Sequence, residues 1–118
     1  MGTRVMALPV FDPDGAASHL GLRREDILEL TKMFLQDIPS WRESFAEAAI
    51  NTEQLRTASH RLKGEAANIG AQALRTAAYN LEQAVLNGFD RVAVEEIRLL
   101  LLEELDVFAR EAQLITGP

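Results

Sequence analysis

A histidine and a lysine three positions apart are the residues in this sequence with the clearest chemical potential. His60 and Lys63 lie in the stretch HRLKGEAANIG. A neutral imidazole is a nucleophile near neutral pH, because histidine side chains titrate close to pH ~6.5 in unstructured chains. Phosphoryl transfer asks little of the acceptor beyond placement and charge compensation, which Lys63 could provide one helical turn away. His60 is therefore the candidate phospho-acceptor, with Lys63 in support.

This stretch has the apolar spacing of a helix but contains a glycine in its interior. Leu62 and Ile69 belong to the apolar stripe, and Gly64 within the helix costs about 1 kcal/mol relative to alanine. At about 100° per residue, His60 lies on the side opposite to the stripe and shares that side with Gly64 and Ala67. We interpret Gly64 and Ala67 as room through which a bulky partner can reach the imidazole.

The same part of the helix carries positive charge within an acidic chain. Arg56, Arg61 and Lys63 precede Gly64, and no acidic residue lies between Arg56 and Gly64. Arg56 is a candidate docking residue together with Ala67, although a solubilising role would explain Arg56 equally well. An outward histidine on a helix is usually no more than a solvated side chain, but the glycine and the basic flank favour chemistry here.

Composition excludes several classes of protein. The 118-residue chain has a net charge of −6, which argues against nucleic acid as a partner. It has no cysteine, which excludes thiol chemistry and fits a reducing, cytoplasmic compartment. No apolar run of about 18 residues predicts a membrane span, and the N-terminus does not resemble a signal peptide.

Other chemical apparatus is not visible in the sequence. No Gly-rich phosphate loop or Walker motif accompanies His60, so we expect no cofactor of the chain's own. A phosphoryl donor must then bring its own metal ion and active site. His19 has no neighbouring ligand set, and we expect no metal site.

Helix-forming residues dominate, and patterns typical of strands are nearly absent. Asp12, Asn51 and Asp90 are candidate N-caps, and Gln54 is placed to complete a capping box with Asn51. Pro39 is expected to kink or break the helix that contains it. The expected helices span residues 13–20, 24–50 (interrupted at the proline), 52–69, 71–86 and 91–113.

Four longer helices with short connections predict an all-α fold, an up-down four-helix bundle with a short additional N-terminal helix. We expect one domain over residues 1–118, with residues 1–10 irregular. The leucine run 99–102 is more apolar than one helix face requires, so either two neighbouring helices cover it or it contacts another copy or a missing domain. The aromatic residues expected in the core or at its edge are Phe34, Trp41, Phe45 and Phe108.

The histidine stretch resembles the signature of histidine-containing phosphotransfer (HPt) domains. The matching residues are His60, Leu62, Lys63, Gly64 and Gly70, and the resemblance covers most of residues 10–87. It implies a monomeric helical bundle that accepts a phosphoryl group from a receiver-domain aspartate and passes it to another receiver. The implied partners are response-regulator receiver domains and, where one exists, a hybrid sensor histidine kinase. The receiver would supply Mg²⁺ and the catalytic groups, so the chain would be a carrier without an ATP site.

The resemblance also directs attention to the helix that follows. Members of this family often place a polar side chain from that helix near the histidine. Glu82 falls at a suitable position, although its carboxylate would repel a phosphoryl group, and Gln83 remains an alternative. Glu65 stands where the family usually has a small residue, and its helical angle points it toward a neighbouring helix rather than toward His60.

Other functions remain open at the level of the sequence. The alternative reading is a non-catalytic helical adaptor that binds a receiver or another signalling partner without phosphorylation. A phospho-accepting module of a histidine kinase would need a dimerisation helix pair and an ATP-binding domain, which these residues lack. A phosphate sink, which discharges a receiver without passing the group on, would have the same sequence features as a relay.

Overall fold

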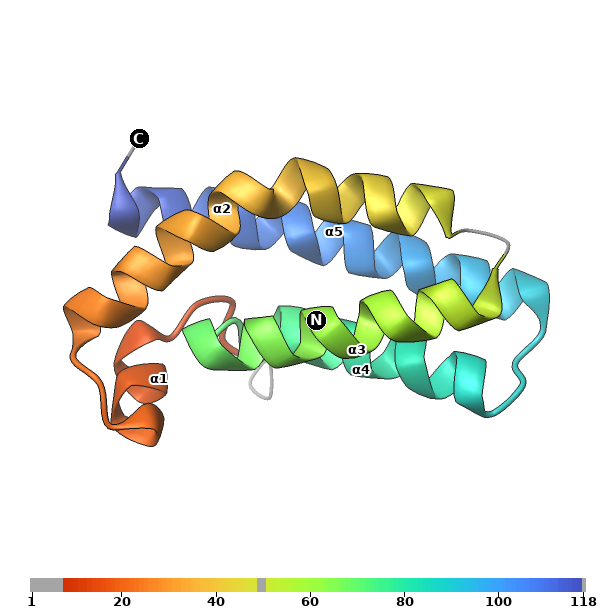
Figure 1. The fold of residues 1–118 in the computed structure, drawn as a ribbon, viewed down its shortest axis with the longest axis horizontal. Helices are drawn as coiled ribbons and strands as arrows, with labels where there is room; N and C mark the ends of the chain where they lie inside the picture. The colour runs from red at the N-terminus through yellow and green to blue at the C-terminus, as the bar shows by residue number, and fades with distance from the viewer. Residues whose placement is uncertain (1–7, 49–50, 118) are drawn as a thin grey trace, which may run out of the picture.

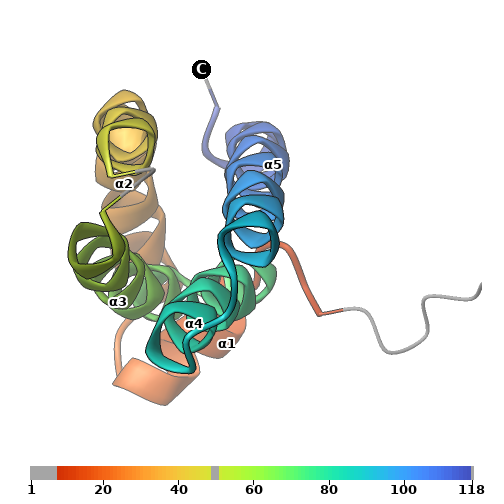
Figure 2. The ribbon, with the colours of Figure 1, turned by 90° about the vertical axis from the view of Figure 1, so that its right-hand side faces the viewer.

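The chain folds into a bundle of four long helices with a short helix packed at one end (Figure 1). The computed structural model describes residues 8–48 and 51–117, and no strand occurs among them. The end-on view in Figure 2 shows α2, α3, α4 and α5 in sequence around the bundle. The predicted all-α bundle is therefore confirmed. The five helices are α1 (Pro13–Leu20), α2 (Arg24–Glu47), α3 (Thr52–Ile69), α4 (Gln72–Leu86) and α5 (Arg91–Thr116).

Side-chain caps begin three of the helices, as the sequence predicts. The carboxylates of Asp12 and Asp90 accept hydrogen bonds from backbone N–H groups three residues on, at 3.0 and 2.9 Å. The Asn51 side chain likewise accepts from the Gln54 N–H at 3.0 Å. The reciprocal bond from the Gln54 side chain is not formed within the described residues, so only half of the predicted capping box is present. These bonds satisfy donors that a helix start leaves unpaired.

Gly70 ends α3 and joins it to the N-terminal segment. Its φ of 77° lies in the left-handed region that glycine adopts without strain. Its carbonyl oxygen accepts a hydrogen bond from the Asp12 N–H at 2.9 Å. A Cβ at this position would lie 2.2 Å from the Asp12 carbonyl oxygen. Only glycine therefore allows the start of α1 to pack against the end of α3.

Pro39 was expected to kink or break its helix, and the break does not occur. Helix α2 continues through Pro39 to Glu47, and Figure 1 shows it changing direction near its middle. Proline removes one helical hydrogen bond, but a long helix whose apolar face is buried on both sides of it tolerates the loss. Trp41 and Phe45 continue the buried stripe beyond the proline. The expected end at residue 50 lies outside the described residues.

The core contains the four aromatic side chains that the sequence predicts there. Phe34, Trp41, Phe45 and Phe108 are all buried, and Phe34 meets Phe108 edge to face with ring centroids 5.6 Å apart. Such a contact adds about 1 kcal/mol to the burial of the rings. This cluster ties α2 to α5 across the bundle.

Neighbouring helices cover only part of the leucine run on α5. Leu101 is fully buried, but Leu99 and Leu100 are 49% and 58% exposed. One helix cannot turn consecutive residues toward the same core, and residues 8–48 and 51–117 supply no further helix to cover Leu99 and Leu100. Among the described residues, no helix is long and apolar enough to cross a membrane.

Candidate functional site

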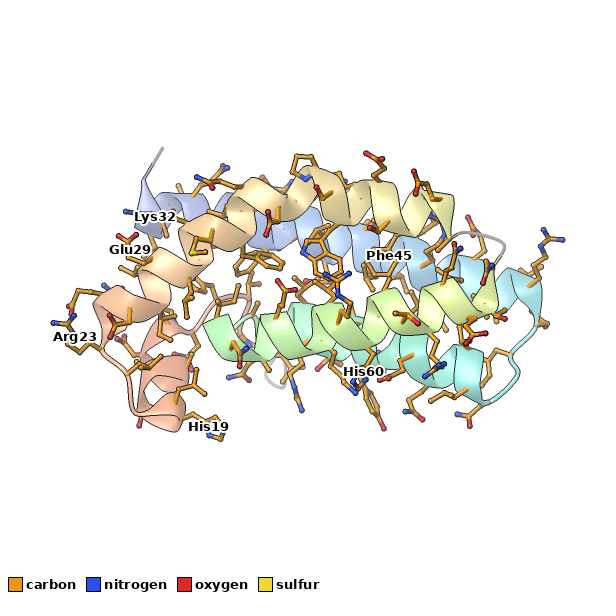
Figure 3. All side chains as sticks on the ribbon, in the orientation of Figure 1. His19, Arg23, Glu29, Lys32, Phe45 and His60 are labelled. Carbon is orange, nitrogen blue, oxygen red and sulfur yellow. The ribbon has the colours of Figure 1, made fainter. Side chains whose placement is uncertain are left out.

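His60 projects from the outer side of α3, as its helical angle predicts. Its side chain is 66% exposed, and Figure 3 shows it on the side of α3 turned away from α2. Ala67, two turns along, is exposed on the same helix. A Cβ added at Gly64 would meet no atom within 4 Å, so the surface beside the imidazole is open. The predicted space for an approaching partner is present.

The imidazole of His60 is hydrogen-bonded to a carboxylate of the neighbouring helix, α4. His60 Nδ1 lies 2.7 Å from Glu82 Oε2, and Lys63 Nζ donates to Glu82 Oε1 at 2.6 Å. The two oxygens of one carboxylate on α4 therefore bind two side chains that lie one turn apart on α3. The Glu82 side chain is only 7% exposed and that of Lys63 is 25% exposed. Glu82 is thus buried between the helices, while His60 reaches into solvent.

The charge on Glu82 decides which nitrogen of His60 carries the proton. Burial of the carboxyl disfavours its charged form, but the hydrogen bonds from Lys63 and His60 outweigh this effect and lower the pKa of Glu82. Glu82 is consequently ionised at neutral pH and can only accept hydrogen bonds. Nδ1 of His60 must then be the donor in this pair. The other ring nitrogen, Nε2, keeps its lone pair when the imidazole is neutral, and no hydrogen bond from the described residues reaches it.

The two residues that the sequence left as alternatives on α4 have different surroundings. Glu82 contacts His60, whereas Gln83 lines a groove between α4 and α5. Consecutive helical residues point about 100° apart, so only one of them can face α3. The suggestion that Gln83 approaches the histidine is therefore wrong. The objection that a carboxylate repels a phosphoryl group is also weakened, because Glu82 lies at the edge of the ring opposite to Nε2.

The positive charges of α3 are paired more than the sequence suggests. Arg56 lies 3.9 Å from Glu53, and Arg61 lies 4.0 Å from Glu65, both along the same helix. These exposed pairs contribute little stability, but they reduce the net positive charge around His60. Glu65 does not touch the imidazole, in agreement with its predicted angle. Arg56 remains about half exposed, four residues before His60.

Tyr79 is a neighbour of the site that the sequence analysis missed. Its side chain is about half exposed, and Lys63 Nζ lies 5.7 Å from the centre of its ring, within the range of a cation–π contact. Tyr79 precedes Glu82 by three residues on α4, so both face α3. That spacing was readable in the sequence once Glu82 had been placed against α3.

His19, the second histidine, takes no part in this arrangement. It lies on α1, well separated from His60 in Figure 3. Within residues 8–48 and 51–117, no three histidine or acidic side chains are grouped so that they could hold a metal ion.

Comparison with known protein families places most of the chain in one of them. The family model described as the Hpt domain matches residues 29–111, which include α3, α4 and most of α2 and α5. Neither a curated protein nor a solved structure matches the chain. The family match covers more than half of the chain and contains both His60 and Glu82. The chain therefore belongs to the Hpt domain family, whose helical bundles carry phosphoryl groups on histidine in two-component phosphorelays.

Proposed function

We propose that His60 is the phospho-acceptor of this domain and that its Nε2 atom forms the bond to phosphorus. The observation that carries the proposal is the hydrogen bond between Nδ1 and the buried carboxylate of Glu82. This bond selects the tautomer in which Nε2 is the nucleophile, and it leaves Nε2 on the solvent side of the ring. The 66% exposure of the side chain gives a partner protein access to that atom.

The phosphoryl donor is the aspartyl phosphate of a receiver domain. The lone pair of Nε2 attacks phosphorus, the bond between phosphorus and the aspartate oxygen breaks, and the electron pair leaves with the carboxylate. The ring keeps its Nδ1 proton and gains a positive charge, which faces the carboxylate of Glu82. Transfer to a second receiver reverses these changes. Mg²⁺ and the groups that stabilise the transferring phosphoryl belong to the receiver, and the chain binds no nucleotide.

Two residues support the acceptor in different ways. Gly64 leaves the surface beside the imidazole free, so that the rim of a receiver's active site can approach Nε2. Lys63 places a positive charge one turn from His60, where it compensates part of the charge of the bound phosphoryl group. Lys63 also neutralises Glu82 in the unphosphorylated protein, so its ammonium group serves two anions in turn.

The docking surface is the exposed face of α3 together with the adjoining part of α4. Arg56 and Ala67 lie on this face on either side of His60, and Tyr79 adds an exposed aromatic ring. Receiver domains of response regulators, including the receiver of a hybrid sensor kinase, are the partners of this surface. A small contact of this kind suits a transient complex, which a carrier requires in order to release its partner.

The test is transfer from phosphorylated receiver domains in the presence of Mg²⁺, followed by intact mass. We expect the wild-type chain to gain the mass of one phosphoryl group, labile to acid, and His60→Gln to gain none. His19→Gln is the matched control and should be phosphorylated like the wild type. Uptake by His60→Gln would refute the assignment. Tight binding of a receiver by the wild type without any transfer would favour the adaptor instead.

A further inference from the structure

A groove on the far side of α4 is separate from the histidine site. In Figure 2, α4 lies at the bottom of the bundle and α5 lies above it to the right. The groove is lined by residues of α4 and α5 and has a volume of about 650 Å³. This volume is in the range of specific binding sites. Its walls include the apolar side chains of Ala77, Ala84, Ile97 and Leu100. Gln83 lines this groove while its neighbour Glu82 contacts His60, so the groove and the phospho-acceptor face different directions.

Several large apolar side chains of this groove are exposed to solvent. Leu100 is 58% exposed, Phe89 is 51% exposed and Leu8 is 44% exposed, and all three line the same hollow. Single exposed leucines are ordinary on protein surfaces. A set that converges on one groove is typical of an interaction site. The exposure of Leu100, which core packing does not explain, is thereby given a role.

Two acidic side chains also line the groove, and one of their carboxylate oxygens lacks a hydrogen-bond donor among the described residues. Glu103 and Glu104 both line it. The Oε2 atom of Glu104 is excluded from solvent, and no hydrogen-bond donor of the described residues reaches it. An acceptor left dry and unpaired in this way is costly, and native structures contain few of them. A cation entering the groove would pair with the carboxylate of Glu104, which lines it, and arginine offers the planar, multiple donors that suit a carboxylate.

We propose that this groove binds an amphipathic helix of a partner protein, with an apolar stripe that ends in an arginine. Helix α4 borders the groove from Ala73 to Ala84, about 17 Å or three turns at 1.5 Å per residue. Alanines along this border let the backbone of a third helix approach closely, as in other helix-in-groove complexes. The apolar stripe covers Leu100 and Phe89, and the arginine reaches Glu104.

Charge favours a basic partner over a second copy of this chain. The chain carries a net charge of −6, and a symmetric dimer through this groove would bring Glu103 and Glu104 of both copies to one interface. Like charges at an interface oppose association. Because the groove does not include His60 or Lys63, the bound helix leaves the phospho-acceptor open to a receiver. The partner is therefore an anchor for the carrier and does not compete with phosphotransfer.

The test uses two fluorescein-labelled helical peptides of fourteen residues as probes. Both have leucines at positions i, i+3, i+4 and i+7; one has an arginine a turn beyond the last leucine and the other a glutamine there. Fluorescence anisotropy with the full chain should give saturable binding of the arginine peptide and at least about tenfold weaker binding of the glutamine peptide. Glu104→Gln should remove this preference, and Leu100→Asp should abolish binding.

The matched control is Leu99→Asp, because Leu99 is exposed to a similar degree but does not line the groove. This variant should bind like the wild type. All three variants should take up phosphoryl groups normally, which separates this proposal from the role of His60. Equal binding of the two peptides, or no saturable binding, would overturn the proposal. A gain in affinity after deletion of residues 1–7 would show that the chain's own N-terminus is the occupant, and concentration-dependent dimerisation lost in Leu100→Asp would show that a second copy is.

Discussion

The pair formed by Lys63 and Glu82 should be asymmetric when each partner is removed. Lys63→Met leaves the carboxylate of Glu82, which is 7% exposed, with His60 as its one remaining donor. Loss of one partner of a fully buried pair costs about 3–5 kcal/mol. Because Lys63 is 25% exposed and His60 still donates, we expect about 2 kcal/mol here. Glu82→Met leaves the Lys63 ammonium and the His60 imidazole near the surface, where water can solvate both, and should cost about 1 kcal/mol or less.

The double variant should therefore resemble Glu82→Met alone, because no buried carboxylate remains to be orphaned. The coupling free energy between the two positions then equals the cost of Lys63→Met alone, about 2 kcal/mol. Urea unfolding followed by circular dichroism at pH 7 measures all four proteins, provided that their m-values agree. If the two single variants lose equal free energies of unfolding, and these losses add in the double variant, the reasoning that Glu82 is a buried charge is refuted.

The pair formed by Lys63 and Glu82 also predicts how the stability lost in Lys63→Met depends on pH. The bonds from Lys63 and His60 hold the pKa of Glu82 below its ordinary value in the folded protein. The stability that this carboxylate contributes is therefore fully present above the unfolded-state pKa of about 4.3, and is lost as the pH falls through the lower folded value. Lys63→Met removes the stronger of these two bonds. The difference in unfolding free energy between wild type and variant should shrink when unfolding is repeated below about pH 4, and a constant difference would contradict the assignment.

Three further predictions concern the glycines and the tautomer. Gly64→Ala should raise the free energy of unfolding by up to about 1 kcal/mol, because the new Cβ meets no atom within 4 Å. The same variant should take up the phosphoryl group from a phosphorylated receiver more slowly. Urea unfolding measures the first effect and transfer time courses measure the second. Gly70→Ala should cost about 2 kcal/mol or more in the same unfolding assay, because its φ is 77° and the new Cβ would overlap the Asp12 carbonyl oxygen; an unchanged midpoint would contradict this. Glu82→Gln should reduce the Nδ1-protonated fraction of neutral His60, observed by ¹⁵N NMR of the ring; an unaltered tautomer ratio would show that Glu82 does not select it.

The outward placement of His60 could be predicted from the sequence because it depends on one helix alone. The apolar residues of α3 define its buried side, and the position of His60 relative to them follows from the helical period. The openness around Gly64 follows from the same geometry and from the lack of a side chain. Helix starts were predictable for a similar reason, since Asp12, Asn51 and Asp90 act on N–H groups only three residues away.

Features that depend on two helices were predicted less well. Glu82 and Gln83 are adjacent, and the choice between them requires the rotation of α4 relative to α3, which periodicity within α4 does not define tightly. Tyr79 was missed for the same reason. The exposure of Leu99 and Leu100 depends on how many helices surround α5. Pro39 was overestimated as a helix breaker because packing on both sides of it outweighs one lost hydrogen bond.

The position of Glu82 also answers the concern that a carboxylate should not stand beside a phosphohistidine. The two nitrogens of an imidazole lie on different edges of the ring, and the protein occupies only the Nδ1 edge. If Nε2 bonds to phosphorus as proposed, a positive charge develops on the ring, and Glu82 Oε2 lies 2.7 Å from Nδ1 of that ring. On the proposed assignment, the carboxylate would face the cationic ring, while the phosphoryl oxygens would extend toward solvent and the partner. A buried glutamate on α4 is in this way compatible with the chemistry proposed for an exposed histidine on α3, because the contact with Glu82 occupies the Nδ1 edge of the ring and leaves the Nε2 edge to a partner.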